Sequence, residues 1–218
     1  MVNIYQEARV NTDKLRELPE LPETSNELRL IAKYLNASEG DLYLRERASE
    51  TELKSADLSN SSVLAFATHG LVAGELSSLA EPALVLTPPT IGSDLDDGLL
   101  KASEVAQLNL NADMVLLSAC NTASGETLRA EGLSGLARAF IYAGARSLLV
   151  SHWSVDSGAA TKLTTGLFAA LEGNPEIGRA EALQFSMMSL VSDDENPHYS
   201  HPAFWAPFSL IGEGAALK

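Results

Sequence analysis

Three short, uninterrupted apolar runs constrain the fold of this chain more than any other feature. They are VLAFAT (63–68), MVLLSA (114–119) and SLLVSHW (147–153). Continuous apolar runs of this length are typical of parallel strands that helices cover on both faces. The segment GLSGLARAFIYAGA (132–145) lies between the last two runs, with apolar residues at helical spacing and Gly144 suited to the helix exit. The runs therefore indicate βαβ units and a mostly parallel sheet.

Apolar periodicity also predicts the remaining elements. Ser49 is a candidate N-cap of the helix expected at 49–58. The chain has 218 residues, of which 45% are apolar, so it can bury one sizeable core. The aspartates of the stretch TIGSDLDDG are expected to be solvated turn residues. We expect helices at 27–36, 49–58, 158–172 and 177–191, and strands at 40–47, 83–87 and near 203–212.

Charge and cysteine content exclude several classes of protein. The chain has 29 acidic and 15 basic residues, a net charge of −14, which would repel nucleic-acid phosphates. The opening MVNIYQEARV does not have the pattern of a signal peptide, and no apolar stretch reaches the roughly 18 residues of a membrane span. We therefore expect a cytoplasmic protein with no nucleic-acid or membrane partner. Cys120 is the single cysteine, which excludes an internal disulfide and a four-cysteine zinc site.

Two chemically capable side chains follow two of the predicted parallel strands. His69 comes directly after the run 63–68, and Cys120 directly after the run 114–119. Parallel strands end at the same edge of a sheet, so on neighbouring strands His69 could act as general base for the Cys120 thiol. The N–H groups of Gly70 and Cys120 would then stabilise the oxyanion that forms when a thiolate attacks a carbonyl. This arrangement predicts acyl transfer to cysteine followed by hydrolysis.

Several stretches resemble the CHAT domain, a caspase-like cysteine peptidase domain related to separase. They include FATHG, DGLLKASEV, MVLLSACNTASGE, SLLVSHWSVD and HPAFWAPFSLIG. The resemblance runs from LPELPETSNEL to the C-terminus and implies a caspase-like three-layer α/β/α sandwich with a mostly parallel central sheet. It divides the chain into an N-terminal extension or linker remnant (1–22) and the CHAT domain itself (23–218).

The same resemblance implies a function. In that family a His-Cys dyad cleaves peptide bonds, and here His69 and Cys120 would form the dyad, with Gly70 and Cys120 as the oxyanion hole. CHAT proteins usually carry TPR or other repeats before this domain, so a regulatory module and a protein substrate are the expected partners. No cofactor is implied. No close-spaced ligand pair accompanies the two residues, so no metal site is predicted.

Three residues at the end of the run 147–153 and just after it are candidates for the substrate pocket. His152 and Trp153 leave a strand at the predicted edge, and the alternative role for both is packing at a strand end. Asp156 could hold a basic substrate side chain, as acidic residues near this exit do in relatives of separase. The alternative role of Asp156 is to cap the following helix. His198 and His201, in a loop that enters the last strand, are expected to be structural.

Alternatives to a peptidase remain open at the level of sequence. Cys120 could be a small core residue, and His69 a strand-end histidine bonded to the backbone. The chain could then be a catalytically latent, caspase-like interaction scaffold. Hydrolysis of a small amide or ester would use the same dyad but would need an enclosed pocket. The loop NTASGETLRAEG (121–132) follows the nucleophile and could gate the site.

Overall fold

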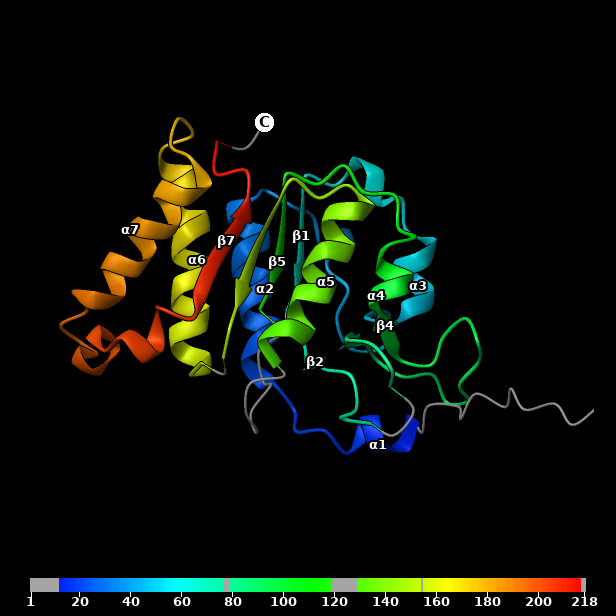
Figure 1. The fold of residues 1–218 in the computed structure, drawn as a ribbon. Helices are drawn as coiled ribbons and strands as arrows, with labels where there is room; N and C mark the ends of the chain where they lie inside the picture. The colour runs from blue at the N-terminus through cyan, green and yellow to red at the C-terminus, as the bar shows by residue number, and fades with distance from the viewer. Residues whose placement is uncertain (1–11, 77–78, 119–128, 154, 217–218) are drawn as a thin grey trace, which may run out of the picture.

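The computed structural model describes residues 12–76, 79–118, 129–153 and 155–216 of the chain. Their core is a four-stranded sheet in the order β1-β5-β6-β7, flanked by helices on both faces (Figure 1). Its strands are β1 (Val63–Phe66), β5 (Met114–Leu117), β6 (Ser147–Ser151) and β7 (Phe208–Gly212). The first three run parallel and β7 pairs antiparallel with β6. The predicted three-layer α/β/α sandwich with a mostly parallel sheet is confirmed.

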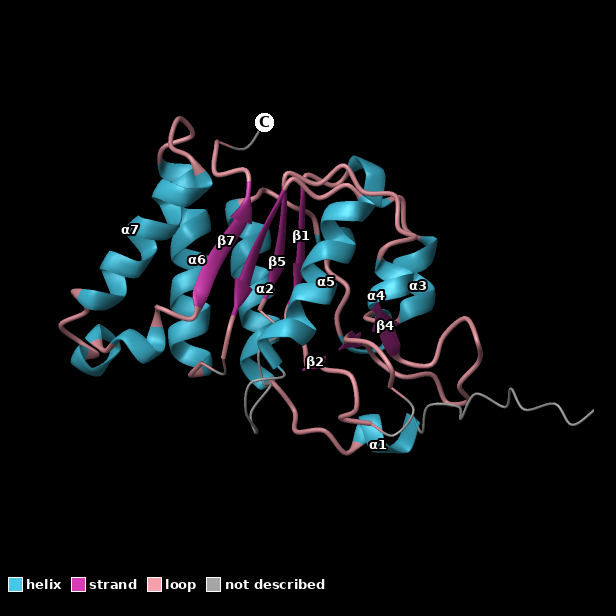
Figure 2. Ribbon diagram, in the orientation of Figure 1, coloured by secondary structure: helices cyan, strands magenta, loops and turns pink. Residues whose placement is uncertain are grey.

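The helices divide between the two faces of the sheet, and Figure 2 shows α5 in front of the strands and α2 behind them. Met114 and Leu116 pack against one group of helices, whereas Val115 and Leu117 pack against the other. This alternation follows from the period of two along a strand. The first group comprises α2 (Pro22–Tyr34), α6 (Ser157–Gly173) and α7 (Arg179–Val191), and the second comprises α3 (Glu50–Ser55), α4 (Ala102–Val105) and α5 (Arg129–Ala143).

A second, smaller sheet extends the molecule beside the carboxyl end of β1. It is antiparallel, in the order β2-β3-β4, and comprises β2 (Gly70–Leu71), β3 (Ala83–Val85) and β4 (Leu99–Lys101). The short helix α1 (Thr12–Arg16) lies near this sheet, and Leu15 belongs to the same buried cluster as Val85 and Leu99. Figure 1 shows α1 at the bottom, below β2.

One predicted strand is wrong. Residues 40–47 form two 3₁₀ turns, η1 (Glu39–Asp41) and η2 (Arg45–Arg47), around a short extended stretch. Arg45 has φ +52°, in the left-handed region that interrupts a strand. Alternating hydrophobicity in this segment reflects the cavity that Leu42 and Leu44 line rather than a ladder of hydrogen bonds.

The acidic stretch 90–98 is anchored more firmly than its composition predicts. Asp96 is buried and accepts hydrogen bonds from the backbone N–H and the hydroxyl of Thr51, at 3.2 and 2.6 Å. The carboxylate of Glu50, fully buried in α3, accepts backbone N–H groups of residues 97–99 and pairs with Lys54. Burial raises the pKa of Glu50, and the Lys54 ammonium opposes that shift. Ser49 caps α3 as predicted, by accepting the N–H of Glu52.

The amino ends of β5 and β6 and the carboxyl end of β7 are fastened together at one end of the sheet. Arg179 is 1% exposed and donates to the backbone carbonyls of Asp113 and Glu213, at 2.8 and 3.1 Å. Gly144, after α5, has φ +115°, and a Cβ there would lie 2.1 Å from the carbonyl oxygen of Leu110. Only glycine fits this predicted helix exit. The start of α7 and the end of α5 are thereby held against the residues that precede β5.

No helix within the described ranges combines the length and the apolar character required to cross a membrane.

Candidate functional site

β1 and β5 are neighbours and leave the sheet at the same edge. Phe66 pairs with Leu117, and the carbonyl of Phe66 accepts the N–H of Ser118 at 2.9 Å. His69 therefore emerges beside the end of β5, and in the sequence Cys120 follows Ser118 by two residues. Cys120 and the first eight residues of the loop 121–132 lie outside the described residues. The strand adjacency on which the sequence argument depended is confirmed.

The His69 imidazole is held by the main chain between α1 and α2. Its Nε2 lies 2.7 Å from the carbonyl oxygen of Pro19, and the residue is 8% exposed. A carbonyl only accepts hydrogen bonds, so Nε2 must carry a proton and the lone pair of the neutral ring is on Nδ1. Pro19 thus fixes both the tautomer and the orientation of the ring. Sequence reasoning missed this contact because a backbone carbonyl has no signature in the sequence.

The backbone around His69 is built into the small sheet. The carbonyl of His69 accepts the N–H of Val85 at 2.8 Å, and the Thr68 hydroxyl donates to the carbonyl of Val85. Gly70 pairs with Leu84. Because His69 and Val85 form a hydrogen-bonded pair, the alternation of an antiparallel ladder turns the Gly70 N–H away from β3. The site edge therefore carries an imidazole and a backbone donor on adjacent, rigid residues.

A buried carboxylate lies next to the end of β5. Glu27 in α2 is 3% exposed, accepts the hydroxyl of Thr164 in α6 at 2.8 Å, and is hydrogen bonded to the Ser118 side chain. Burial raises the pKa of Glu27, and the bonds from Thr164 and Ser118 oppose that shift. Sequence reasoning missed Glu27, although its position one turn before Ile31 places both on the inner face of the helix.

His152 and Trp153 leave β6 at the same edge and bond to the segment that enters β7. The His152 N–H donates to the carbonyl of Pro207 at 3.0 Å, and its Nε2 lies 3.0 Å from the hydroxyl of Ser209. The Trp153 indole N–H donates to the carbonyl of Ala203 at 3.4 Å, while 45% of the residue stays exposed. Packing at the strand end accounts for these contacts. The structure leaves a role of either residue in substrate binding untested.

Asp156 caps α6, which was the structural alternative for this residue. Its Oδ1 accepts the N–H of Ala159 at 3.0 Å and the hydroxyl of Tyr199 at 3.3 Å. The residue remains exposed, so its carboxylate could also meet a ligand. Of the other two histidines, His201 accepts the N–H of Ala203, and His198 packs on Tyr199 with ring centroids 4.3 Å apart. Both have the structural roles expected of them.

Two substitutions separate the roles of Asp156. Asp156→Ala removes the cap and should lower the free energy of unfolding by about 1 kcal/mol. Asp156→Asn keeps a side-chain acceptor for Ala159 but removes the charge, so the melting temperature should change little. Equal melting temperatures for the Ala variant and the parent would contradict the cap. Thermal melts make the comparison.

Among the described residues, no group of three or more His, Cys, Asp and Glu side chains is arranged to hold a metal ion.

Comparison with known proteins places this geometry in a family. The model of the CHAT domain matches residues 6–213 of the chain. Tetratricopeptide repeat protein 28 of Mus musculus is 30% identical over 163 residues, which are 69% of this chain and 6% of that protein. Tetratricopeptide repeat protein 28 of Homo sapiens is 29% identical over 168 residues, 72% of this chain and 6% of that protein. The matched region is thus a small part of each of these relatives.

Proposed function

The chain belongs to the CHAT domain family, and from this we propose that it is a cysteine endopeptidase with Cys120 as nucleophile and His69 as general base. One observation carries the proposal. The His69 ring, oriented by the Pro19 carbonyl, lies at the end of β1, and the neighbouring strand β5 leads directly to Cys120. A nucleophile and a base that is oriented by a third group form the arrangement that activates a thiol.

The mechanism follows from the atoms available. The lone pair on Nδ1 of His69 takes the proton of the Cys120 thiol, and the thiolate attacks the carbonyl carbon of the scissile peptide. The Gly70 N–H, turned away from β3, and the Cys120 N–H would stabilise the oxyanion. The protonated imidazole then gives its proton to the leaving amine. Water, deprotonated by the same imidazole, hydrolyses the acyl-enzyme and releases the thiol.

We propose further that the substrate has a basic residue before the cleaved bond. Glu27 supplies one carboxylate, because it is hydrogen bonded to Ser118, which precedes Cys120 by two residues in the sequence. Asp156 supplies a second carboxylate at the exit of β6. A cationic substrate side chain next to Glu27 would stabilise the Glu27 carboxylate, whose ionised form burial disfavours. The net charge of −14 would assist the approach of a basic substrate. His152 and Trp153 are the proposed remaining walls of this pocket.

Regulation by a second module is also part of the proposal. The two relatives are named for tetratricopeptide repeats, and the matched region is 6% of each. A repeat module, in the same chain or in a partner, would control access of a protein substrate to the edge where His69 emerges.

The reactivity of Cys120 tests the proposal directly. Cys120 is the single cysteine, so alkylation by iodoacetamide reports on one thiol, and the urea-unfolded chain provides the matched reference. In the native chain the alkylation rate should follow an ionisation below the roughly 8.5 of a free thiol. Arginine and lysine peptides should then be cleaved. The proposal is wrong if the native and unfolded thiols titrate alike and no such peptide is cut, with or without a repeat module.

A further inference from the structure

One side chain joins the short helix α1 to the loop between β3 and β4. The guanidinium of Arg16 donates to the backbone carbonyl of Pro88 at 3.2 Å and also to that of Pro89. Within the described part of the chain, its other bonds go to Thr12 and Asp13 of α1 itself. An exposed pair of that local kind is worth only about 0.2–0.5 kcal/mol. The bonds to the loop are therefore the contacts of Arg16 that can fix where α1 lies.

Helix α1 needs such contacts in order to exist. It has five residues, and an isolated helix of fewer than about 12 residues is marginal in water. Leu15 is 4% exposed and packs in one cluster with Val85 and Leu99. Apolar contacts of this type are not directional, whereas two bonds from one planar guanidinium set an orientation. Leu15 thus holds α1 against the small sheet, and Arg16 fixes its direction.

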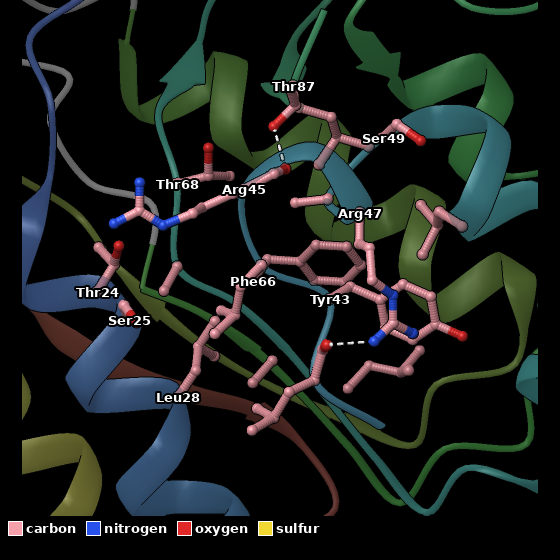
Figure 3. A pocket seen from close by; sticks show the side chains of 18 of the residues that line it. Thr24, Ser25, Leu28, Tyr43, Arg45, Arg47, Ser49, Phe66, Thr68 and Thr87 are labelled. Atoms are coloured by element: carbon pink, nitrogen blue, oxygen red, sulfur yellow. Dashed lines mark hydrogen bonds between the residues drawn. The ribbon is translucent and has the colours of Figure 1, made fainter. Parts of the chain in front are cut away.

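The part of the loop that Arg16 contacts is itself fixed. The hydroxyl of Thr87 donates to the carbonyl of Arg45 at 2.6 Å (Figure 3), and its N–H donates to the carbonyl of Ala48 at 2.8 Å. The buried carboxylate in α3 binds the N–H groups at the far end of the loop. Gly98 has φ +82°, and a Cβ there would lie 2.7 Å from that of Pro88. Close packing and bonds on both sides make this loop a rigid support.

The connector between α1 and α2 carries this support to the candidate site. Three residues after Arg16, the carbonyl oxygen of Pro19 lies 2.7 Å from Nε2 of His69. Leu18 donates its N–H to the last turn of α1 and packs in the same apolar cluster. The proline ring fixes φ of its own residue and restricts the backbone of the residue before it. The Pro19 carbonyl therefore lies on a stiff connector, and Arg16 holds one end of it.

We propose that Arg16 is a positioning residue, which holds the His69 ring in its working orientation through α1 and the Pro19 carbonyl. Without the guanidinium, α1 would rest on its apolar contacts and the carbonyl would leave Nε2 for part of the time. The ring could then rotate, and the lone pair on Nδ1 would lose its direction. Arg16 touches no reacting atom. Its kinetic effect rests on the proposed peptidase function, but the bond from Nε2 can be observed without any activity.

The first test observes that bond in the full chain labelled with ¹⁵N. The imidazole N–H proton of His69 is assigned as the NMR signal that His69→Gln removes. A proton bonded to a carbonyl exchanges with water only when the bond opens. Arg16→Met should therefore speed its exchange about tenfold, as measured by saturation transfer from water. The ring signals of His152 and His201 are internal references and should not change.

Two further variants make the comparison specific. Arg29→Met is the matched control, because the Arg29 side chain is about as exposed as that of Arg16, 50% against 40%, and pairs with Glu39 on the surface. It should leave the exchange of the His69 proton at the parental rate. Arg16→Lys keeps the charge but cannot reproduce the planar fork, so its exchange rate should lie between those of Arg16→Met and the parent. Melting curves establish that each variant is folded.

The second test measures cleavage of an arginine peptide. A base that is out of place slows the chemical step and leaves binding of the substrate intact. Arg16→Met should therefore lower kcat about tenfold at unchanged KM. If the parent chain cleaves no peptide, the proposed function fails, whereas proton exchange at His69 still decides the role of Arg16.

Four results would overturn the proposal. The first is parental exchange of the His69 proton in a folded Arg16→Met variant. The second is equally fast exchange in Arg29→Met, because loss of any positive charge would then have the same effect. The third is a simultaneous change at His152 and His201, which would indicate general loosening of the fold. The fourth is a raised KM with unchanged kcat, which would assign Arg16 to substrate binding.

Discussion

Replacing His69 with glutamine is expected to lower kcat/KM for peptide cleavage by about 10² to 10⁴-fold, the contribution of a general base. The glutamine amide can donate to the Pro19 carbonyl as Nε2 does, so packing is retained while the base is lost. Cys120→Ala removes the nucleophile and should abolish turnover. Cleavage of an arginine peptide, followed by steady-state kinetics, measures both effects.

The control for this experiment is His198→Ala, because His198 is exposed and its ring packs on those of Tyr199 and Phe204. Its kcat/KM should equal that of the parent chain. Melting temperatures of all variants should stay within a few degrees of the parent, which separates loss of chemistry from loss of fold. A folded His69→Gln variant that cleaves at the parental rate would remove His69 from the catalytic assignment.

Replacing Glu27 with glutamine is expected to lower kcat/KM for arginine and lysine peptides about 100-fold while stabilising the fold. Loss of a charge-assisted bond to a buried cation accounts for the kinetic effect. The gain in stability has a separate cause. Burial raises the pKa of Glu27, so at neutral pH its ionised form is costly in the folded chain.

The sign of the pH dependence follows from linkage. A carboxyl whose folded pKa is raised binds more protons in the folded state, so the free energy of unfolding falls as pH rises above the ordinary value of 4.5. Glu27→Gln should remove that fall and flatten the profile. Glu23→Gln, on the exposed first turn of the same helix, is the matched control and should change neither stability nor selectivity. Unchanged selectivity in Glu27→Gln would exclude Glu27 from the pocket.

The central sheet could be predicted from sequence because its strands are buried on both faces. That burial requires continuous apolar runs at 63–68, 114–119 and 147–153, and the helices between them require parallel connections. The segment 40–47 misled the same reasoning. Its alternating leucines line a cavity, and the positive φ of Arg45 interrupts the extended backbone. Periodicity reports which side chains are buried, and it does not report whether a partner strand exists.

The candidate site was predictable only in part. His69 and the strand adjacency followed from side-chain type and position, because a titratable residue at the end of a buried strand is distinctive. Pro19 contributes a carbonyl, which every residue has, and Glu27 meets Ser118 and Thr164 only through packing of α2 against α6. Contacts of these two kinds depend on tertiary geometry and leave no local pattern in the chain.

The fastening of the sheet by Arg179 and Gly144 has a consequence for how the backbone amides exchange with solvent. The buried guanidinium and the close approach of Gly144 to Leu110 join the amino ends of β5 and β6 to the carboxyl end of β7. The edge where β1 and β5 end is held by other contacts, from Glu27 to Ser118 and Thr164 and from His69 to the Pro19 carbonyl. Exposure of the amides at the fastened end requires the buried Arg179 bonds to break, so these amides should exchange with solvent only when the sheet as a whole unfolds.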